Sequence, residues 1–163
     1  MIDWFFIGLA VALGGGEGSA SGSDAAQAGA NEAAPSAGFE AEDQTPSGKF
    51  TTAAEIRPII EATRGNWVAV REYDGQDLLY LTHLLSWRCG MHQVSVAVNG
   101  GAMEIWDMPV CQTKTAAPNA FPDGAVIYKS FGLGEIESIA VEILYDDLGT
   151  AEGLFGRKEV LMP

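Results

Sequence analysis

Residues 89–112 read CGMHQVSVAVNGGAMEIWDMPVCQ and contain both cysteines of the 163-residue chain. The pair Asn99-Gly100 stands between two runs of β-prone residues, which is a strong short-range signal of a β-hairpin. The stretch therefore predicts strands at 92–98 and 101–107, joined by a two-residue turn.

The side chains of this hairpin indicate its register. Strict pairing from the two-residue turn places Val94 opposite Ile105 and Val96 opposite Met103, which gives one apolar face. A shift of one residue would place Val96 opposite Glu104, so we expect the strict register.

In that register, Trp106 lies on the polar face of the hairpin. A tryptophan there either packs beneath a neighbouring loop or contributes to a binding surface, and we favour packing. If Trp106 is exposed, we expect it to form a contact patch with Arg88 and His92.

Cys89 and Cys111 lie near each other at the open end of the hairpin, where Gly90 and Pro109 would break the strand pairing. A disulfide there closes a loop of about 23 residues and is worth on the order of 3 kcal/mol. A redox pair normally has C-x-x-C spacing, and a zinc site would need every cysteine and histidine of the chain. We therefore predict a structural disulfide, with two free buried thiols as the alternative. A disulfide indicates an oxidising compartment.

The N-terminal residues 1–20 contain an apolar run of about ten residues, which is shorter than the roughly twenty needed to cross a bilayer. The run has the length of a signal-peptide core, although Asp3 precedes it and no positive charge does. A cleaved signal peptide is the favoured interpretation. An interfacial anchor and the absence of any targeting role remain open.

Composition divides the rest of the chain into two parts. Residues 21–49 are rich in Gly, Ala and Ser with scattered acids, which predicts a disordered linker. Residues 50–163 contain enough large apolar side chains for one modest core, which predicts a single β-rich domain.

The chain carries 22 acidic and 9 basic residues, a net charge of −13. Such a field repels polyanions, so we expect no nucleic-acid partner and no binding to an anionic membrane surface. We interpret the excess of acidic residues as a soluble surface that resists aggregation, in preference to an acidic docking site.

A helix is predicted at about 52–64, where Thr52 and Glu55 fit a capping box. Pro58 implies that this helix is kinked or starts later. Strand-like patterns follow at 67–73, 78–87, 92–98, 101–107, 126–131, 136–145, 151–157 and, as a short closing strand, 159–162. Roughly seven or eight strands at this spacing predict a mainly β fold, an antiparallel β-sandwich or small barrel with one N-terminal helix.

The residues offer few candidates for catalysis. Cys89, His92 and Asp107 could be imagined as nucleophile, base and orienting acid, but a disulfide at Cys89 removes the nucleophile. His83 lies in an apolar run, where a core or cross-strand histidine is the ordinary interpretation. We therefore predict no catalytic residue, no metal site and no cofactor.

Residues 51–90, TTAAEIRPIIEATRGNWVAVREYDGQDLLYLTHLLSWRCG, with VNGG at 98–101, Cys111, PNA at 118–120 and YDD at 145–147, resemble a group of small, uncharacterised exported bacterial proteins. The resemblance covers residues 50–163 and implies export and a paired Cys89–Cys111. It implies no catalytic residue, and the long linker departs from the group's plan of a signal peptide followed directly by a domain.

The sequence thus favours an exported, periplasmic or secreted β domain that acts as a non-enzymatic binding or accessory module for an unknown protein partner, with no transmembrane span. The alternative is a small secreted enzyme or enzyme inhibitor whose site lies on loops such as 112–124.

Overall fold

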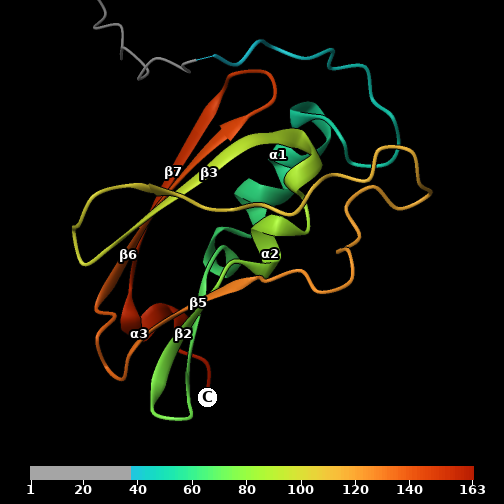
Figure 1. Cartoon of the computed structure of the whole chain (residues 1–163). Coiled ribbons are helices and arrows are strands. Elements are labelled where there is room, and N and C mark those ends of the chain that lie inside the picture. The colour runs from blue at the N-terminus through green and yellow to red at the C-terminus, as the bar shows by residue number, and fades with distance from the viewer. Residues whose placement is uncertain (1–37) are drawn as a thin grey trace, which may run out of the picture. The chain divides into compact units, whose positions relative to one another are not determined.

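The computed structural model describes residues 38–163, which form two antiparallel β-sheets with short helices (Figure 1). The predicted signal peptide at 1–20 and the linker residues 21–37 lie outside the described residues. Within the described part of the chain, no helix is long and apolar enough to cross a membrane. In chain order the elements are α1 (Ala53–Ala62), η1 (Arg64–Asn66), β1 (Ala69–Tyr73), β2 (Gln76–Tyr80), α2 (Thr82–Leu85), η2 (Arg88–Gly90), β3 (Met91–Val98), β4 (Glu104–Ile105), β5 (Tyr128–Gly132), β6 (Ser138–Tyr145), β7 (Thr150–Gly156) and α3 (Arg157–Val160).

One sheet has three strands in the order β1-β2-β5, and the other has four in the order β4-β3-β6-β7. Every neighbouring pair is antiparallel. Residues alternate between buried and partly exposed along β6, as expected for a strand with one face on the core. Side chains from both sheets and from α1 share one hydrophobic core, so the prediction of a mainly β, antiparallel fold is confirmed.

Helix α1 begins as its sequence predicts. The Thr52 hydroxyl accepts a hydrogen bond from the Glu55 amide at 3.3 Å, and the Glu55 carboxylate accepts one from the Thr52 amide at 3.2 Å. This capping box satisfies amides that have no partner inside the helix. Pro58 lies inside the helix, which buries Ile56 and Ile60 in the core.

The strand predicted at 78–87 is wrong beyond residue 80. The chain leaves β2 there and forms α2, because Leu81, Leu84 and Leu85 have the i, i+3, i+4 spacing of a helical turn and are all fully buried. A run that is apolar on both faces fits either periodicity when only the residue types are read.

The predicted closing strand at 159–162 is also replaced by a helix. The Glu159 carboxylate accepts a hydrogen bond from the Gly156 amide at 2.6 Å, which caps the single turn of α3. Only one isolated parallel bridge follows, between Leu161 and Val70.

The turn at Asn99-Gly100 is confirmed, because both residues have positive φ and the Gly101 amide donates to the Val98 carbonyl at 3.0 Å. The strict register is wrong, because Val96 pairs with Glu104. The shift places Trp106 opposite Val94, to whose carbonyl the Trp106 amide donates at 2.8 Å. Trp106 thereby turns into the core, and the large apolar area of an indole explains why this register is favoured.

Residues 38–49, assigned from composition to the disordered linker, lie against the domain. The Glu42 amide donates to the Asp146 carbonyl at 2.8 Å, and Gln44 Nε2 donates to Asp146 Oδ1 at 2.9 Å. The same carboxylate accepts from the Ala53 amide at 2.8 Å. A polar anchor can therefore order a segment that has little apolar surface of its own.

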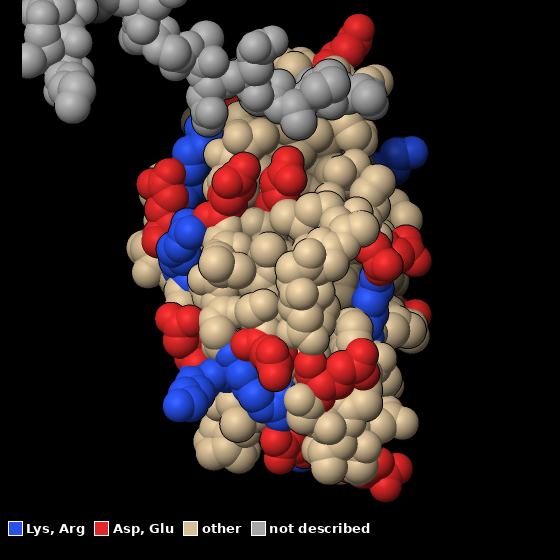
Figure 2. All heavy atoms as spheres, turned by 90° about the vertical axis from the view of Figure 1, so that its left-hand side faces the viewer, with Lys and Arg blue, Asp and Glu red and all other residues tan. Residues whose placement is uncertain are grey.

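The surface mixes both charges. Figure 2 shows one side of the molecule, on which basic side chains stand beside acidic ones around an uncharged central area. The ion pairs include Arg57 with Asp147 at 2.7 Å and Lys129 with Glu104 at 3.6 Å. On this face the acidic groups stand among basic and uncharged side chains.

Candidate functional site: a loop braced by a disulfide and a buried arginine

The connection from β4 to β5, residues 106–127, contains no helix or strand. Irregular connections of this length are uncommon in compact domains and are often functional. Two side chains and one covalent bond hold this loop against the rest of the domain.

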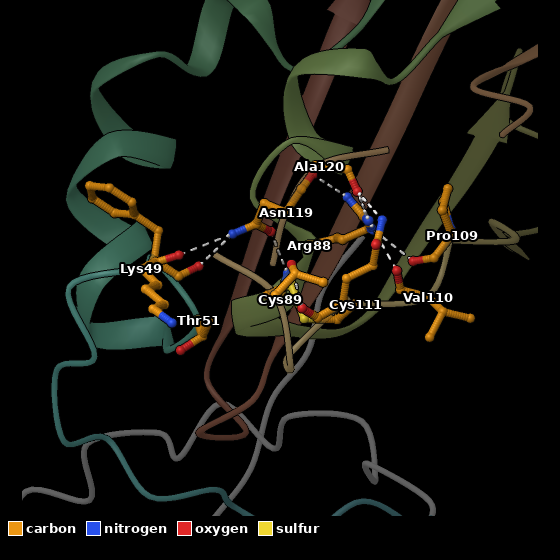
Figure 3. The surroundings of a disulfide bond; sticks show 12 residues. Lys49, Thr51, Arg88, Cys89, Pro109, Val110, Cys111, Asn119 and Ala120 are labelled. Atoms are coloured by element: carbon orange, nitrogen blue, oxygen red, sulfur yellow. Dashed lines mark hydrogen bonds between the residues drawn. A yellow bond between two sulfur atoms is a disulfide. The ribbon is translucent and has the colours of Figure 1, made fainter. Parts of the chain in front are cut away.

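The covalent bond is the disulfide between Cys89 and Cys111 (Figure 3). Their Cα atoms are 5.3 Å apart, and the bond ties the loop to η2, immediately before β3. The predicted disulfide is therefore confirmed. Because both cysteines of the chain are in it, Cys89 is not available as a nucleophile in this state.

Arg88 is the second brace, and its side chain lies at the centre of Figure 3. The residue is only 2% exposed, yet its guanidinium faces backbone carbonyls and no carboxylate. Burial lowers its pKa, but an arginine keeps its charge in proteins. Its hydrogen bonds run from Nε to Pro109 O at 2.6 Å, from Nη1 to Leu85 O at 3.0 Å and Asn119 O at 2.7 Å, and from Nη2 to Val110 O at 3.0 Å and Ala120 O at 2.9 Å.

These bonds use all five N–H donors of the guanidinium. The carbonyl dipoles thus take the place of a counter-ion. Because the acceptors belong to α2 and to two separated parts of the loop, one side chain fixes three stretches of backbone together.

Asn119 is the third brace. Its Oδ1 accepts a hydrogen bond from the Cys89 amide at 2.9 Å, and its Nδ2 donates to the Phe50 carbonyl at 2.8 Å. The loop is thereby joined to the disulfide on one side and to the segment before α1 on the other (Figure 3).

The contact patch of Trp106, Arg88 and His92 depended on an exposed Trp106, and this condition is not met. Trp106 is 3% exposed and packs in the core, as the favoured alternative predicted. Arg88 braces the loop. His92 instead holds the N-terminal segment, because its ring stacks on Phe39 at 4.7 Å and its Nε2 bonds the Glu40 carbonyl at 2.9 Å.

The braced loop leaves apolar side chains in solvent. Val110 is 80% exposed and Val126 is 65% exposed. Both line an open groove of about 420 Å³ between residues 107–110 and 122–126, and its charged lining residues are Asp107 and Asp123. Nothing in the local sequence marked this groove, because it forms only when two loop segments are brought side by side.

The remaining chemical candidates are separated. His83 lies on α2, where burial lowers its pKa and its Nε2 is 2.7 Å from the Thr63 hydroxyl. Within residues 38–163, no group of three or more Cys, His, Asp or Glu side chains is arranged to hold a metal ion.

The arrangement can therefore present an apolar surface whose backbone is held in place. Comparisons with protein-family models, with curated proteins and with solved structures give no match for this chain.

Proposed function

We propose that the protein is an exported, non-enzymatic binding or accessory module of the β-sandwich kind, which docks a protein partner on the groove of loop 106–127. The observation that carries the proposal is an irregular loop held by a disulfide and a buried arginine while Val110 and Val126 stand in solvent. A surface that is fixed before binding loses less entropy on association.

The buried charge of Arg88 is energetically costly. Burying a charge has a desolvation penalty of several kcal/mol, and an apolar side chain of similar size would often serve stability better. Its Nη2 bonds the carbonyl of Val110 itself, so the buried charge sets the position of an exposed apolar side chain. We infer that the buried charge serves to position Val110 as well as to stabilise the loop.

The groove also indicates the partner's chemistry. An apolar side chain fits between Val110 and Val126, and basic groups next to it would meet Asp107 and Asp123. Aromatic or aliphatic anchors in preformed pockets commonly dominate such interfaces.

The disulfide supports the proposal of export, because disulfides persist in oxidising compartments and are rare in the cytosol. The periplasm or the exterior of a bacterium is the compartment that agrees with the apolar run at 1–20.

The inhibitor alternative would use the exposed tip around Lys114. This tip is a closed turn, in which the Thr115 amide donates to the Gln112 carbonyl at 3.0 Å and the Gln112 amide donates to the Pro118 carbonyl at 2.9 Å. Recognition of an exposed segment by strand addition requires extended backbone. The turn therefore favours docking on the groove over insertion of the tip into an enzyme.

Site-specific photocrosslinking in an expressing bacterium tests the proposal. A photoreactive residue at position 110 should give a discrete crosslinked partner, and Val126→Asp should abolish it. The same residue at position 154, an exposed leucine on β7, is the matched control. Equal crosslinking at the two positions, or a band at 110 that survives Val126→Asp, would refute docking on the groove.

A further inference from the structure

A second groove, of about 610 Å³, lies between β1, the start of α2 and the segment that follows α3. Its volume is within the range of small-molecule sites. Its lining includes Arg71, Tyr80, His83, Glu159, Leu161 and Met162.

One wall of this groove is apolar and fixed in place. Leu161 and Met162 keep much of their side chains in solvent. Their backbone is held against the edge of β1, because the Met162 amide donates to the Val70 carbonyl at 2.7 Å. An apolar ligand body therefore has a preformed surface on which to lie.

Arg71 supplies the only Lys or Arg side chain in the lining. Its guanidinium stands 5.1 Å from the centre of the Tyr73 ring and makes no ion pair with another described residue. Arg57 and Arg157, by contrast, are engaged by carboxylates. The fork of Arg71 remains available for a carboxylate, which arginine binds through two parallel hydrogen bonds.

His83 adds no second positive charge. The Thr63 hydroxyl donates its proton to the Ile59 carbonyl at 2.6 Å, so at the 2.7 Å contact His83 Nε2 must be the donor. Burial lowers the His83 pKa, which keeps the ring neutral at pH 7 with Nδ1 as an acceptor. The lining is thus suited to one negative charge and not to a polyanion.

Glu159 lines the groove on the side of α3, and its Oε2 is held by the Gly156 amide at 2.6 Å. Its carboxylate repels a second carboxylate. A ligand with one acidic end is therefore directed with that end toward Arg71.

We propose that this groove binds an amphipathic monocarboxylate, with its carboxylate on Arg71 and its apolar body on Leu161 and Met162. The site is separate from loop 106–127, and the proposal does not depend on protein docking there.

Titrations of the full chain with sodium octanoate, followed by NMR, test this assignment. The matched ligands are octanol and octylamine, which keep the apolar body and remove or invert the charge. We expect octanoate to shift the signals of groove residues, with much weaker effects from octanol and octylamine. Equal affinity for octanol, or the absence of groove shifts with millimolar octanoate, would overturn the proposal without affecting docking on the loop.

Three variants locate the charge. Arg71→Gln should weaken octanoate binding by about tenfold, as expected for the loss of a charge-assisted bidentate contact. Arg64→Gln, which removes an arginine that does not line the groove, should leave binding unchanged. Glu159→Gln should tighten it by about twofold to threefold, because a screened repulsion is removed. Equal effects of the two arginine substitutions would contradict a specific role for Arg71.

Discussion

Arg88→Lys keeps a buried positive charge but removes the planar fork that holds loop 106–127. A lysine has three N–H donors, so at least two of the five carbonyls bonded by Arg88 lose their partner. A hydrogen bond from a charged group contributes about 1.5–3 kcal/mol. With two such bonds lost, the expected decrease in the free energy of unfolding is about 3–6 kcal/mol.

The assay is urea unfolding at pH 7 with the disulfide intact, followed by tryptophan fluorescence. For a domain of this size, the loss corresponds to a fall in Tm of at least about 10 °C. The matched control is Arg64→Lys, because Arg64 is exposed and stacks on Trp67 at 4.9 Å. This control should change stability by less than about 0.5 kcal/mol. An Arg88→Lys protein as stable as the control would refute the bracing role of the guanidinium.

Three further predictions concern other parts of the fold. Hydrogen bonds from Arg157, at 2.5 Å and 3.0 Å, lower the pKa of buried Asp77 to about 2. Since this pKa lies below the ordinary value of 3.8, the ion pair stabilises the fold above about pH 4, and this stabilisation is lost as the pH falls toward 2. The urea midpoint should therefore decrease between pH 5 and pH 2. In the Asp77→Asn protein this decrease should be smaller. Replacing Cys89 and Cys111 by alanine should lower the free energy of unfolding by about 3 kcal/mol. An unchanged urea midpoint would argue against a stabilising role of the disulfide. A chain that begins at residue 50 should be less stable than one that begins at residue 38 by about 2 kcal/mol in the same assay, because it lacks the hydrogen bonds to Asp146; equal stability would show that these contacts contribute nothing.

Features set by neighbouring residues could be predicted from the sequence. The capping box of Thr52 and Glu55 acts within one helical turn, and the turn at 99–100 needs two residues that tolerate positive φ. The disulfide was also predictable, because the chain has only two cysteines and the hairpin brings them together.

Features set by packing were harder to read. The run at 78–87 has apolar residues on both faces of a strand, so its periodicity does not distinguish β2 followed by α2 from one long strand. The hairpin register depended on which side chain the core accepts. The core buries Trp106 and leaves Ile105 in solvent. Choosing the register by the number of apolar cross-strand pairs does not take the larger apolar area of the indole into account.

The candidate site was only partly visible from the sequence. Arg88 and loop 112–124 stood out as residues of interest, but the partners of Arg88 are backbone carbonyls, which every residue possesses. The residue types of the loop therefore do not indicate that Arg88 binds its backbone. The groove beside Val110 likewise depends on how the fold of one loop brings its segments 107–110 and 122–126 side by side.

The bond between Cys89 and Cys111 connects the proposed export with the braced loop, so its redox state in the cell tests both proposals. Thiols should be alkylated in intact bacteria that express the full chain, and the mass of the recovered protein should then be measured. We expect a protein that carries no alkyl group and lacks its N-terminal segment. A full-length protein alkylated at both cysteines would contradict export, and it would show that loop 106–127 is not covalently held where the protein acts.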